Sequence, residues 1–270
     1  MTDRAKPSFP RARKRFGQHF LEPAWVARLV ASVDPRPDET FLEIGPGRGA
    51  LTKALAPKVA RVIAVEIDRD LAATLPNQVP ANVEVIEGDF LAIDLAGVLR
   101  DAGPVRVIGN LPYNISSPIL FKLLDAADEG RRLVDATLML QKEVVDRLTA
   151  SPGSGDYGTL AIQVARLADV ERRLTLPPGA FRPPPKVTSA VVRLQFRPAT
   201  TDVGNPDVFE KVVRGMFLQR RKTLANALKP VADALGRSAG EVLERAGVDG
   251  RRRPETLALD EIGRICRAML

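Results

Sequence analysis

Cysteine and histidine are almost absent from this chain of 270 residues. Cys266 is the single cysteine, so no disulfide can form within the chain, and we expect a protein of the reducing cytoplasm. His19 is the single histidine, which argues against histidine-based zinc sites, Ser-His-Asp triads and Cys-His nucleophiles. The scarcity of both residue types therefore predicts a function that needs neither a resident metal nor a histidine-activated nucleophile.

Long apolar runs are also missing. No segment approaches the roughly 18 residues of a membrane span, and the basic N-terminus lacks the apolar stretch of a secretory signal. Hydrophobic residues make up 45% of the chain and charged residues 27%, as in ordinary globular proteins. The length fits one large domain, or one domain and a smaller one.

Positive charge is concentrated at the two ends of the chain. Residues 1–20 hold six Lys or Arg against one acid, net +5, and residues 205–270 hold thirteen against nine, net +4. The residues between them hold 21 basic and 23 acidic side chains, net −2. This distribution favours a polyanion such as nucleic acid as partner, bound outside the central fold. Solvated surface residues are the alternative explanation.

Five apolar, β-branched runs alternate with helical stretches in the first part of the chain. We expect a helix at 22–32, and the strand-like runs, each followed by a helix, lie at 40–45, 61–68, 83–89, 105–110 and 136–141. This alternation predicts a doubly wound α/β sheet that is parallel in its first part.

The pattern changes after a glycine-rich loop at 151–158. The sequence then predicts a helix near 160–168, two late strands within 172–181 and 190–196 as an antiparallel pair at one sheet edge, and a linker at 197–207. Beyond the linker it predicts only helices, at 209–228, 231–235, 239–246 and 259–269. We therefore divide the chain into a basic arm with the start of the cofactor motif (1–20), an α/β domain (21–200) and a helical C-terminal domain (201–270).

Glycine and acidic residues follow the first three strands. Gly45 opens the turn Gly-Pro-Gly-Arg-Gly, Glu66 closes the second strand and Asp89 the third. Glycine permits close approach of a ligand, and an acid at the second strand end suits the two hydroxyls of a ribose. The third acid is placed to accept from an adenine amino group. Each signal alone has a structural alternative: a tight turn for the glycines, or a helix N-cap for Asp89.

The spacing of the glycines separates two cofactor classes. Dinucleotide dehydrogenases carry G-x-G-x-x-G, which presents a helix N-terminus to a pyrophosphate. Here the glycines follow G-x-G-x-G, and Glu43 stands two residues before the first. This form resembles methyltransferases that use S-adenosylmethionine, a cofactor without phosphate.

The fourth strand ends in Asn110-Leu111-Pro112-Tyr113, which matches the [Asn/Asp/Ser]-x-Pro-[Tyr/Phe] motif of methyltransferases acting on amino groups conjugated to a ring. Such a nitrogen is a poor nucleophile because its lone pair is delocalised. The Asn110 oxygen and a main-chain carbonyl near Leu111 can hold its two hydrogens, which aims the lone pair at the methyl group without a strong base. Pro112 stiffens the turn, and Tyr113 offers a ring on which a base can stack. A proline turn with a packed tyrosine is the structural alternative.

Eight stretches spread over the chain resemble the KsgA/RsmA family of small-subunit ribosomal RNA adenine dimethyltransferases. They are RKRFGQHFL (13–21), LEIGPGRGALT (42–52), VEIDRDLA (65–72), GDFL (88–91), GNLPYNISSPI (109–119), LMLQKEVVDRL (138–148), FRPPPKVTSAVV (181–192) and FLQRRKTLANAL (217–228). The resemblance implies a Rossmann-like class I S-adenosylmethionine-dependent methyltransferase, with a mostly parallel seven-stranded sheet and a small all-α C-terminal domain. It also implies two methyl groups on each of two adjacent adenosines near the 3′ end of small-subunit (16S) ribosomal RNA, and a role in small-subunit biogenesis.

The resemblance further implies the site residues. The expected cofactor contacts are His19, Leu21, Gly45, Glu66, Asp89 and Asn110, and the expected catalytic residues are Asn110, Leu111, Pro112, Tyr113 and Phe181. Phe181 matches the family's second aromatic, so an adenine stacked between Phe181 and Tyr113 is expected, although core packing is the commoner fate of a phenylalanine. His19 departs from the asparagine usual at its place. Neutral histidine keeps one donor and one acceptor, and its charge can change near physiological pH.

Ribosomal RNA is the expected partner. The residues expected to contact it are Arg13, Lys14 and Arg15 in the arm and Arg220, Arg221 and Lys222 in the helical domain. A solvated helix face is the alternative for the second group. Two other functions stay open at this point: an Erm-type enzyme for large-subunit ribosomal RNA, and a mainly non-catalytic ribosome assembly factor. We expect a monomer that does not bind a membrane.

Overall fold

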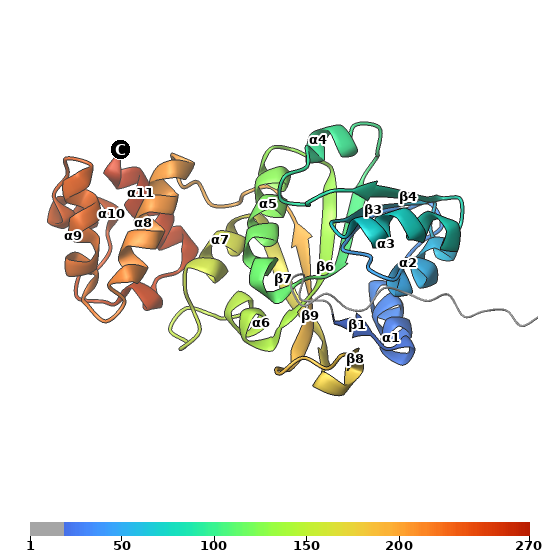
Figure 1. Ribbon diagram of the computed structural model, residues 1–270. Coiled ribbons are helices and arrows are strands. Elements are labelled where there is room, and N and C mark those ends of the chain that lie inside the picture. The colour runs from blue at the N-terminus through green and yellow to red at the C-terminus, as the bar shows by residue number, and fades with distance from the viewer. Residues whose placement is uncertain (1–18) are drawn as a thin grey trace, which may run out of the picture. The chain divides into compact units, whose positions relative to one another are not determined.

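The computed structural model describes residues 19–270, so Arg13, Lys14 and Arg15 lie outside the described residues. A seven-stranded sheet in the order β4-β3-β2-β5-β6-β9-β7 organises the first part of the chain (Figure 1). Its strands are β2 (Thr40–Ile44), β3 (Arg61–Glu66), β4 (Val83–Glu87), β5 (Val105–Asn110), β6 (Leu133–Gln141), β7 (Ala168–Leu176) and β9 (Ser189–Phe196).

The central strands form where apolar and β-branched residues run almost without interruption, because both faces of a parallel sheet are covered. In β5, for example, every residue before Asn110 is buried. Four strand pairs are parallel (β2 with β3, β2 with β5, β3 with β4, and β5 with β6), whereas β9 runs antiparallel to β6. Ile44 is level with Val65 on one neighbour and with Gly109 on the other, so β2, β3 and β5 end side by side.

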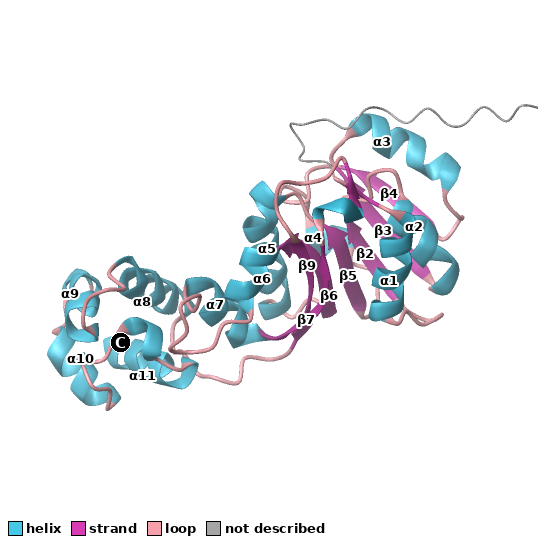
Figure 2. Cartoon of the chain, turned by 90° about the horizontal axis from the view of Figure 1, so that it is seen from below, coloured by secondary structure: helices cyan, strands magenta, loops and turns pink. Residues whose placement is uncertain are grey.

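Helices cover both faces of this sheet. They are α1 (Pro23–Val33), α2 (Ala50–Leu55), α3 (Arg69–Thr74), α4 (Leu95–Val98), α5 (Ser116–Asp128) and α6 (Lys142–Leu148), with short 3-10 turns at Ala56–Lys58, Leu75–Gln78 and Tyr113–Ile115. Apolar residues of α1 and α2 share a core with Phe41, Val62 and Ile108, while α5 lies on the opposite side of the sheet (Figure 2). The chain steps from β2 to β3 in one direction and from β5 to β6 in the other. Ligands of open α/β sheets bind where the crossovers diverge in this way, at the carboxyl ends of the strands.

A second, two-stranded sheet joins the start of the described chain to a late segment. β1 (Phe20–Leu21) pairs antiparallel with β8 (Phe181–Arg182), which follows a 3-10 turn at Pro178–Ala180. The amide of Glu22 extends the pairing by donating to the carbonyl of Ala180 at 2.9 Å. Strands of two residues carry no periodicity, and the sequence therefore did not predict them.

The second compact unit is helical. Its helices are α7 (Thr159–Leu167), α8 (Pro206–Leu218), α9 (Leu224–Ala234), α10 (Ala239–Ala246) and α11 (Leu259–Met269), with a 3-10 turn at Pro254–Thr256. Each helix turns an apolar stripe towards one core, to which Val212, Leu228 and Ile265 belong. Cys266 is buried in the same core, and burial raises the pKa of its thiol to about 12, so the thiolate that would react is not formed at neutral pH.

The division into units differs from the one predicted. One unit runs to Val145 and includes Glu171–Phe196, and the other consists of Asp146–Val170 with Arg197–Leu270. The expected boundary near residue 200 is present, between Phe196 and Arg197. Residues 146–170, however, belong to the helical unit, whereas the sequence places them in the α/β domain. The reason is that Tyr157 and Ile162 bury their side chains in the helical core.

Two helix boundaries also differ. The expected helix at 209–228 is broken between Leu218 and Leu224, where the amide of Leu224 donates to the carbonyl of Arg252 at 2.7 Å instead of continuing a helix. Conversely, α9 continues through Pro230, at which the sequence had suggested a stop, because buried residues on both sides of the proline hold it to the core. None of the described helices is long and apolar enough to span a bilayer.

Candidate active site

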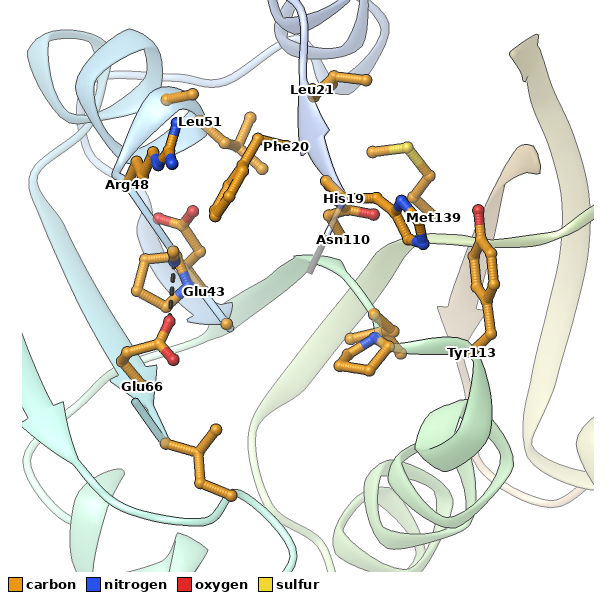
Figure 3. A pocket seen from close by; sticks show the side chains of 17 residues that line it. His19, Phe20, Leu21, Glu43, Arg48, Leu51, Glu66, Asn110, Tyr113 and Met139 are labelled. Atoms are coloured by element: carbon orange, nitrogen blue, oxygen red, sulfur yellow. Dashed lines mark hydrogen bonds between the residues drawn. The ribbon is translucent and has the colours of Figure 1, made fainter. Parts of the chain in front are cut away.

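A pocket opens at the carboxyl ends of β2, β3 and β5, the place at which the crossovers diverge. Its empty volume, which includes the solvent in the open mouth, is about 860 Å³. Figure 3 shows the carboxylates of Glu43 and Glu66 on one side of the pocket and the side chains of His19, Asn110 and Tyr113 on the other. The residues expected from the sequence that line it are His19, Leu21, Gly45, Glu66, Asn110, Leu111, Pro112 and Tyr113.

The glycine turn forms one wall. Gly45, Gly47 and Gly49 have φ of +68°, +58° and +73°, in the left-handed region that side chains disfavour. A Cβ on Gly47 would also lie 3.2 Å from the ring of Phe20, whereas a Cβ on Gly45 would meet nothing within 4 Å. The turn therefore needs glycine for its backbone, and at Gly45 it leaves open space for a ligand.

Glu66 is held rigidly beside this turn. One carboxylate oxygen accepts from the amide of Gly47 and the other from the amide of Asp68, each at 2.8 Å. Burial raises the pKa of Glu66, and the two amide donors counteract that effect. Each oxygen keeps a lone pair, so an oriented acceptor for two ribose hydroxyls is present.

Glu43 is a further acid of the pocket, to which the sequence analysis gave no role. It is 1% exposed, and its Oε2 has no hydrogen-bond partner. Burial raises its pKa to about 7, with the negative charge of Glu66 adding to the rise and the neighbouring Thr52 opposing it. An unpaired buried carboxyl at a pocket wall is typical of a group that meets a ligand. The signal was visible as the glutamate two residues before the glycine turn.

Asn110 faces these acids from the end of β5. Its Nδ2 donates to the main-chain carbonyl of His19 at 2.7 Å. Because a carbonyl can only accept, this bond fixes which end of the amide is nitrogen and leaves the Oδ1 as an acceptor for a ligand. The strand end and β1 thus orient the group that the sequence predicted to hold an amino nitrogen.

Tyr113 is anchored two residues beyond Leu111. Its hydroxyl lies 2.6 Å from the Oγ of Ser189, a residue with no exposed surface. Burial is the main cause that raises the pKa of Tyr113, so the phenol stays neutral. The ring of His19 is stacked against it, with centroids 5.9 Å apart and planes inclined by 22°.

Two expected residues do not line the pocket. Phe181 has no exposed surface and packs in the core shared by α1 and α2, so its ring does not line the pocket in this structure, and stacking of an adenine on it stays a prediction. Its partner across the two-stranded sheet is Leu21, which packs against the same core and also lines the pocket. Asp89 is exposed, and its Oδ1 accepts from the amide of Leu91 at 2.9 Å. This bond caps a turn and not a helix, because the next helix, α4, begins at Leu95 with Asp94 as its N-cap. Contact of Asp89 with an adenine stays a prediction.

The expected RNA-binding residues of the helical unit lie in the turn between α8 and α9. Arg221 and Lys222 are exposed, whereas the guanidinium of Arg220 donates to the carbonyls of Ser154 and Gly155 at 3.3 and 2.7 Å. The amide of Ala225 donates to the carbonyl of Gly250 at 3.0 Å, as Leu224 does to Arg252. The two loops are therefore neighbours, and the basic run Arg251–Arg253, which sequence reasoning did not use, lies beside the turn.

The described part of the chain contains no candidate site for a metal ion. No group of three or more His, Cys, Asp or Glu in residues 19–270 is arranged to hold a metal ion. The donor set of the pocket instead consists of carboxylates, amides and rings, which fits an organic ligand.

Comparison with known proteins extends these observations over the whole chain. The family model "Ribosomal RNA adenine dimethylase" matches residues 10–262. The "Ribosomal RNA small subunit methyltransferase A" of Geobacter metallireducens is 48% identical over 269 residues, covering 96% of both chains. The protein of the same name from Pseudomonas aeruginosa is 44% identical over 263 residues, covering 96% of this chain and 95% of its own length.

Solved structures agree with the fold. A dimethyladenosine transferase from Plasmodium falciparum aligns with a TM-score of 0.80 at 26% identity, covering 92% of this chain and 96% of that one. The 23S rRNA methyltransferase ErmE aligns with a TM-score of 0.65 at 27% identity, covering 93% and 99%. These likenesses confirm the class I methyltransferase fold. Because the match includes the glycine turn, the Asn-Leu-Pro-Tyr strand end and the helical unit, the chain belongs to the ribosomal RNA adenine dimethylase family, as its KsgA/RsmA-like motifs predict.

Proposed function

We propose that this chain is an S-adenosylmethionine-dependent ribosomal RNA (adenine-N6,N6)-dimethyltransferase of the small subunit. It places two methyl groups on each of two adjacent adenosines near the 3′ end of 16S ribosomal RNA and takes part in small-subunit biogenesis. The observation that carries the proposal is the oriented amide of Asn110 beside the ring of Tyr113, at the mouth of a pocket suited to the cofactor. The small-subunit relatives at 44–48% identity support this choice of RNA.

The pocket fits S-adenosylmethionine, the cofactor of this enzyme class, which supplies an electrophilic methyl group on a sulfonium. Glu66 would receive the ribose hydroxyls, because its carboxylate is oriented by two amides. Gly45 leaves open space beside it, and Leu21 and His19 form the opposite wall. The unpaired Oε2 of Glu43 provides a buried acceptor, which suits a cofactor that carries positive charge.

The residues of the strand end would perform the chemistry by positioning. The Oδ1 of Asn110 accepts one hydrogen of the adenine amino group, and a carbonyl near Leu111 accepts the other, so that the nitrogen lone pair points into the pocket. Pro112 limits the motion of the turn. Tyr113, held by Ser189, stacks on the base and fixes its plane. The monomethylated amino group keeps one hydrogen for the same acceptors, which allows a second transfer at the same site.

Ribosomal RNA would also be held by the basic ends of the chain. Arg221 and Lys222 expose their charges in the turn after α8, with Arg253 exposed on the neighbouring loop. These side chains suit phosphates, as do Arg13, Lys14 and Arg15 of the arm. Asp249 and Glu261 already pair with Arg251 and Arg252, so those two arginines are less available.

A monomer in the cytoplasm is the state in which we propose that the enzyme works. The exposed large apolar side chains of the described chain are Ile67, Val134, Val187, Leu218 and Leu270, which come from five separate segments. This distribution offers little for an obligate dimer interface. The cytoplasm follows from the proposed substrate, since ribosomal subunits are assembled there.

The test is transfer of labelled methyl groups from S-adenosylmethionine to two substrates in parallel: small subunits that lack the modification, and unmodified large-subunit RNA. The proposal expects label on two neighbouring adenosines of the small-subunit RNA and none on the large-subunit RNA. Label on a large-subunit adenosine would instead support the Erm-type alternative. Binding to small subunits without transfer would support the assembly factor.

A further inference from the structure

The acid expected to meet the adenine of the cofactor stands on a loop, and a lysine from another element fixes that loop. Asp89 opens the segment between β4 and α4, and Lys122 lies on α5, which begins directly after the Tyr113–Ile115 turn. We propose that Lys122 is a positioning residue: its ammonium holds the turn after Asp89 and so orients the Asp89 carboxylate for the adenine. This inference rests on the proposed function, and it adds to the cofactor site a residue to which the sequence analysis gave no role.

The start of the loop lies beside Glu66. Glu87, the last residue of β4, is level with Glu66 on β3, and the amide of Gly88 donates to the carbonyl of Glu66 at 2.9 Å. Asp89 follows directly, so it stands at the strand end next to the one that carries the proposed ribose acceptor. The order of the two acids across the sheet thus follows the covalent order of ribose and adenine in a nucleoside.

The chain after Asp89 forms a single turn. The amides of Ala92 and Ile93 donate to the Asp89 carbonyl at 2.9 and 3.0 Å, and the amide of Leu91 donates to the Oδ1 of Asp89 at 2.9 Å. The turn thereby holds one carboxylate oxygen and leaves the Oδ2 as an acceptor for a ligand. The direction of the carboxylate therefore depends on the shape of the turn.

Lys122 holds this turn from α5. Its Nζ donates to the carbonyls of Leu91 and Ile93 at 3.0 and 2.7 Å, and it lies 5.5 Å from the ring centroid of the buried Phe90. Both bonds end on main-chain atoms, so the ammonium fixes the course of the loop itself. Both are charge-assisted and therefore stronger than bonds between neutral groups.

The expected effect is specific to one part of the ligand. Without the ammonium the turn opens for part of the time, and a ligand that uses Asp89 must order it again on binding. A nucleoside that lacks the adenine amino group does not use Asp89, so its affinity should not depend on Lys122.

The experiment measures by calorimetry how the full chain binds S-adenosylhomocysteine and S-inosylhomocysteine, which carries an oxo group in place of the adenine amino group. The parent should prefer the adenine compound by about 10- to 100-fold, as one charge-assisted bond implies. Lys122→Met should reduce this preference by at least about fivefold, through weaker binding of the adenine compound alone. Lys122→Arg keeps the charge and the donors and should retain more of the preference than Lys122→Met.

Two further variants make the result specific. Asp89→Ala should abolish the preference, and adding Lys122→Met to it should change the affinity for the adenine compound little, since the two residues act as one unit. Lys58→Met, at an exposed position in the same unit, is the matched control and should keep the parental preference.

The parental preference in Lys122→Met, or an equal loss of affinity for both compounds, would overturn the positioning role, because Lys122 would then support only the fold. A parent that does not distinguish the compounds would also overturn it, since Asp89 would not meet the adenine. A parent that binds neither compound would contradict the proposed cofactor itself. The assay contains no RNA, so a preference that depends on Lys122 in a protein that does not methylate small subunits would overturn only the choice of substrate.

Discussion

Glu66 is the residue whose surroundings define the cofactor side of the pocket most sharply. Replacing it by glutamine in Glu66→Gln leaves the shape nearly unchanged but removes the charge that strengthens its hydrogen bonds. A charge-assisted bond contributes about 1.5–3 kcal/mol, so S-adenosylmethionine should bind about 10- to 100-fold more weakly in calorimetry. The control is Glu87→Gln, one strand away, whose exposed carboxylate only approaches Arg69 at 4.0 Å. Equal affinity for the two variants would remove Glu66 from the site.

The raised pKa of Glu43 predicts that the free energy of unfolding depends on pH. Its folded-state pKa of about 7 lies above the ordinary value of 4.5, so between these values the folded protein holds a proton that the unfolded chain has released. This stabilising contribution is complete below pH 4.5 and is lost as the pH rises through 7. The loss between pH 5 and pH 8 is on the order of 2–3 kcal/mol.

The measurement is the free energy of unfolding of the parent and of Glu43→Gln across this pH range. The parent should lose stability relative to the variant as the pH rises, because glutamine does not titrate. Glu84→Gln, at an exposed ion pair with Arg61, serves as the control and should leave the pH profile of the parent intact. Parallel profiles for the parent and Glu43→Gln would show that Glu43 titrates in its ordinary range.

Residue-level prediction from the sequence succeeded where a residue's role depends on its place at a strand end. Gly45, Glu66 and Asn110 line the pocket because parallel strands bring their carboxyl ends together. For Phe181 the sequence left core packing and a stacking role both open, because the pairing of β8 with β1, where its ring is buried, follows from no local pattern. The partner of the His19 ring was hidden for the same reason.

At the scale of elements, the central strands are locked together at the ends remote from the pocket. Arg106 on β5 donates to both carboxylate oxygens of Asp135 on β6 at 2.9 Å, and Arg193 on β9 reaches the same carboxylate. Asp135 is 1% exposed, and Glu39 approaches Arg106 from the loop before β2. One buried carboxylate thus joins three neighbouring strands.

Removing this carboxylate in Asp135→Asn should destabilise the protein by about 3–5 kcal/mol, because two guanidinium groups lose their buried partner. Asp169→Asn is the control, since its ion pair with Arg197 lies at the surface and should contribute less than about 1 kcal/mol. Urea unfolding followed by circular dichroism measures both. A loss below about 1 kcal/mol for Asp135→Asn would mean that other contacts hold these strands.

Element prediction worked best for strongly patterned segments. β5, α10 and α11 begin and end at the residues that the sequence indicated. The break between α8 and α9 was missed because Gln219–Thr223 contains no glycine or proline, and the turn is fixed by bonds to the loop at Gly250–Arg252. A tertiary cause of this kind leaves no mark in a local window.

At the scale of the whole molecule, binding of ribosomal RNA should weaken steeply with salt, because cations displace counterions from phosphates. Removing Arg220, Arg221 and Lys222 together should flatten the plot of log K against log salt by about 2–3 units, at roughly 0.7–0.9 per phosphate contact. The lower end is expected if Arg220 keeps its bonds to Ser154 and Gly155. The charge-preserving pair Arg220→Lys and Arg221→Lys should keep the parental slope. An unaltered slope for the triple variant would mean that the turn is only a solvated surface.

The central claim is that the oriented amide of Asn110 holds the amino group that is methylated. Single-turnover methyl transfer by Asn110→Ala, at saturating S-adenosylmethionine and small subunit, tests it most directly. The loss of one preorganised acceptor predicts a rate lower by roughly 10²–10³, with substrate RNA bound nearly as before and cofactor weakened less than by Glu66→Gln. Asn114→Ala, four residues away at an exposed position that does not line the pocket, is the matched control and should transfer methyl groups at the parental rate. If Asn110→Ala transfers methyl groups as fast as Asn114→Ala, Asn110 only ends a strand and the mechanism is contradicted.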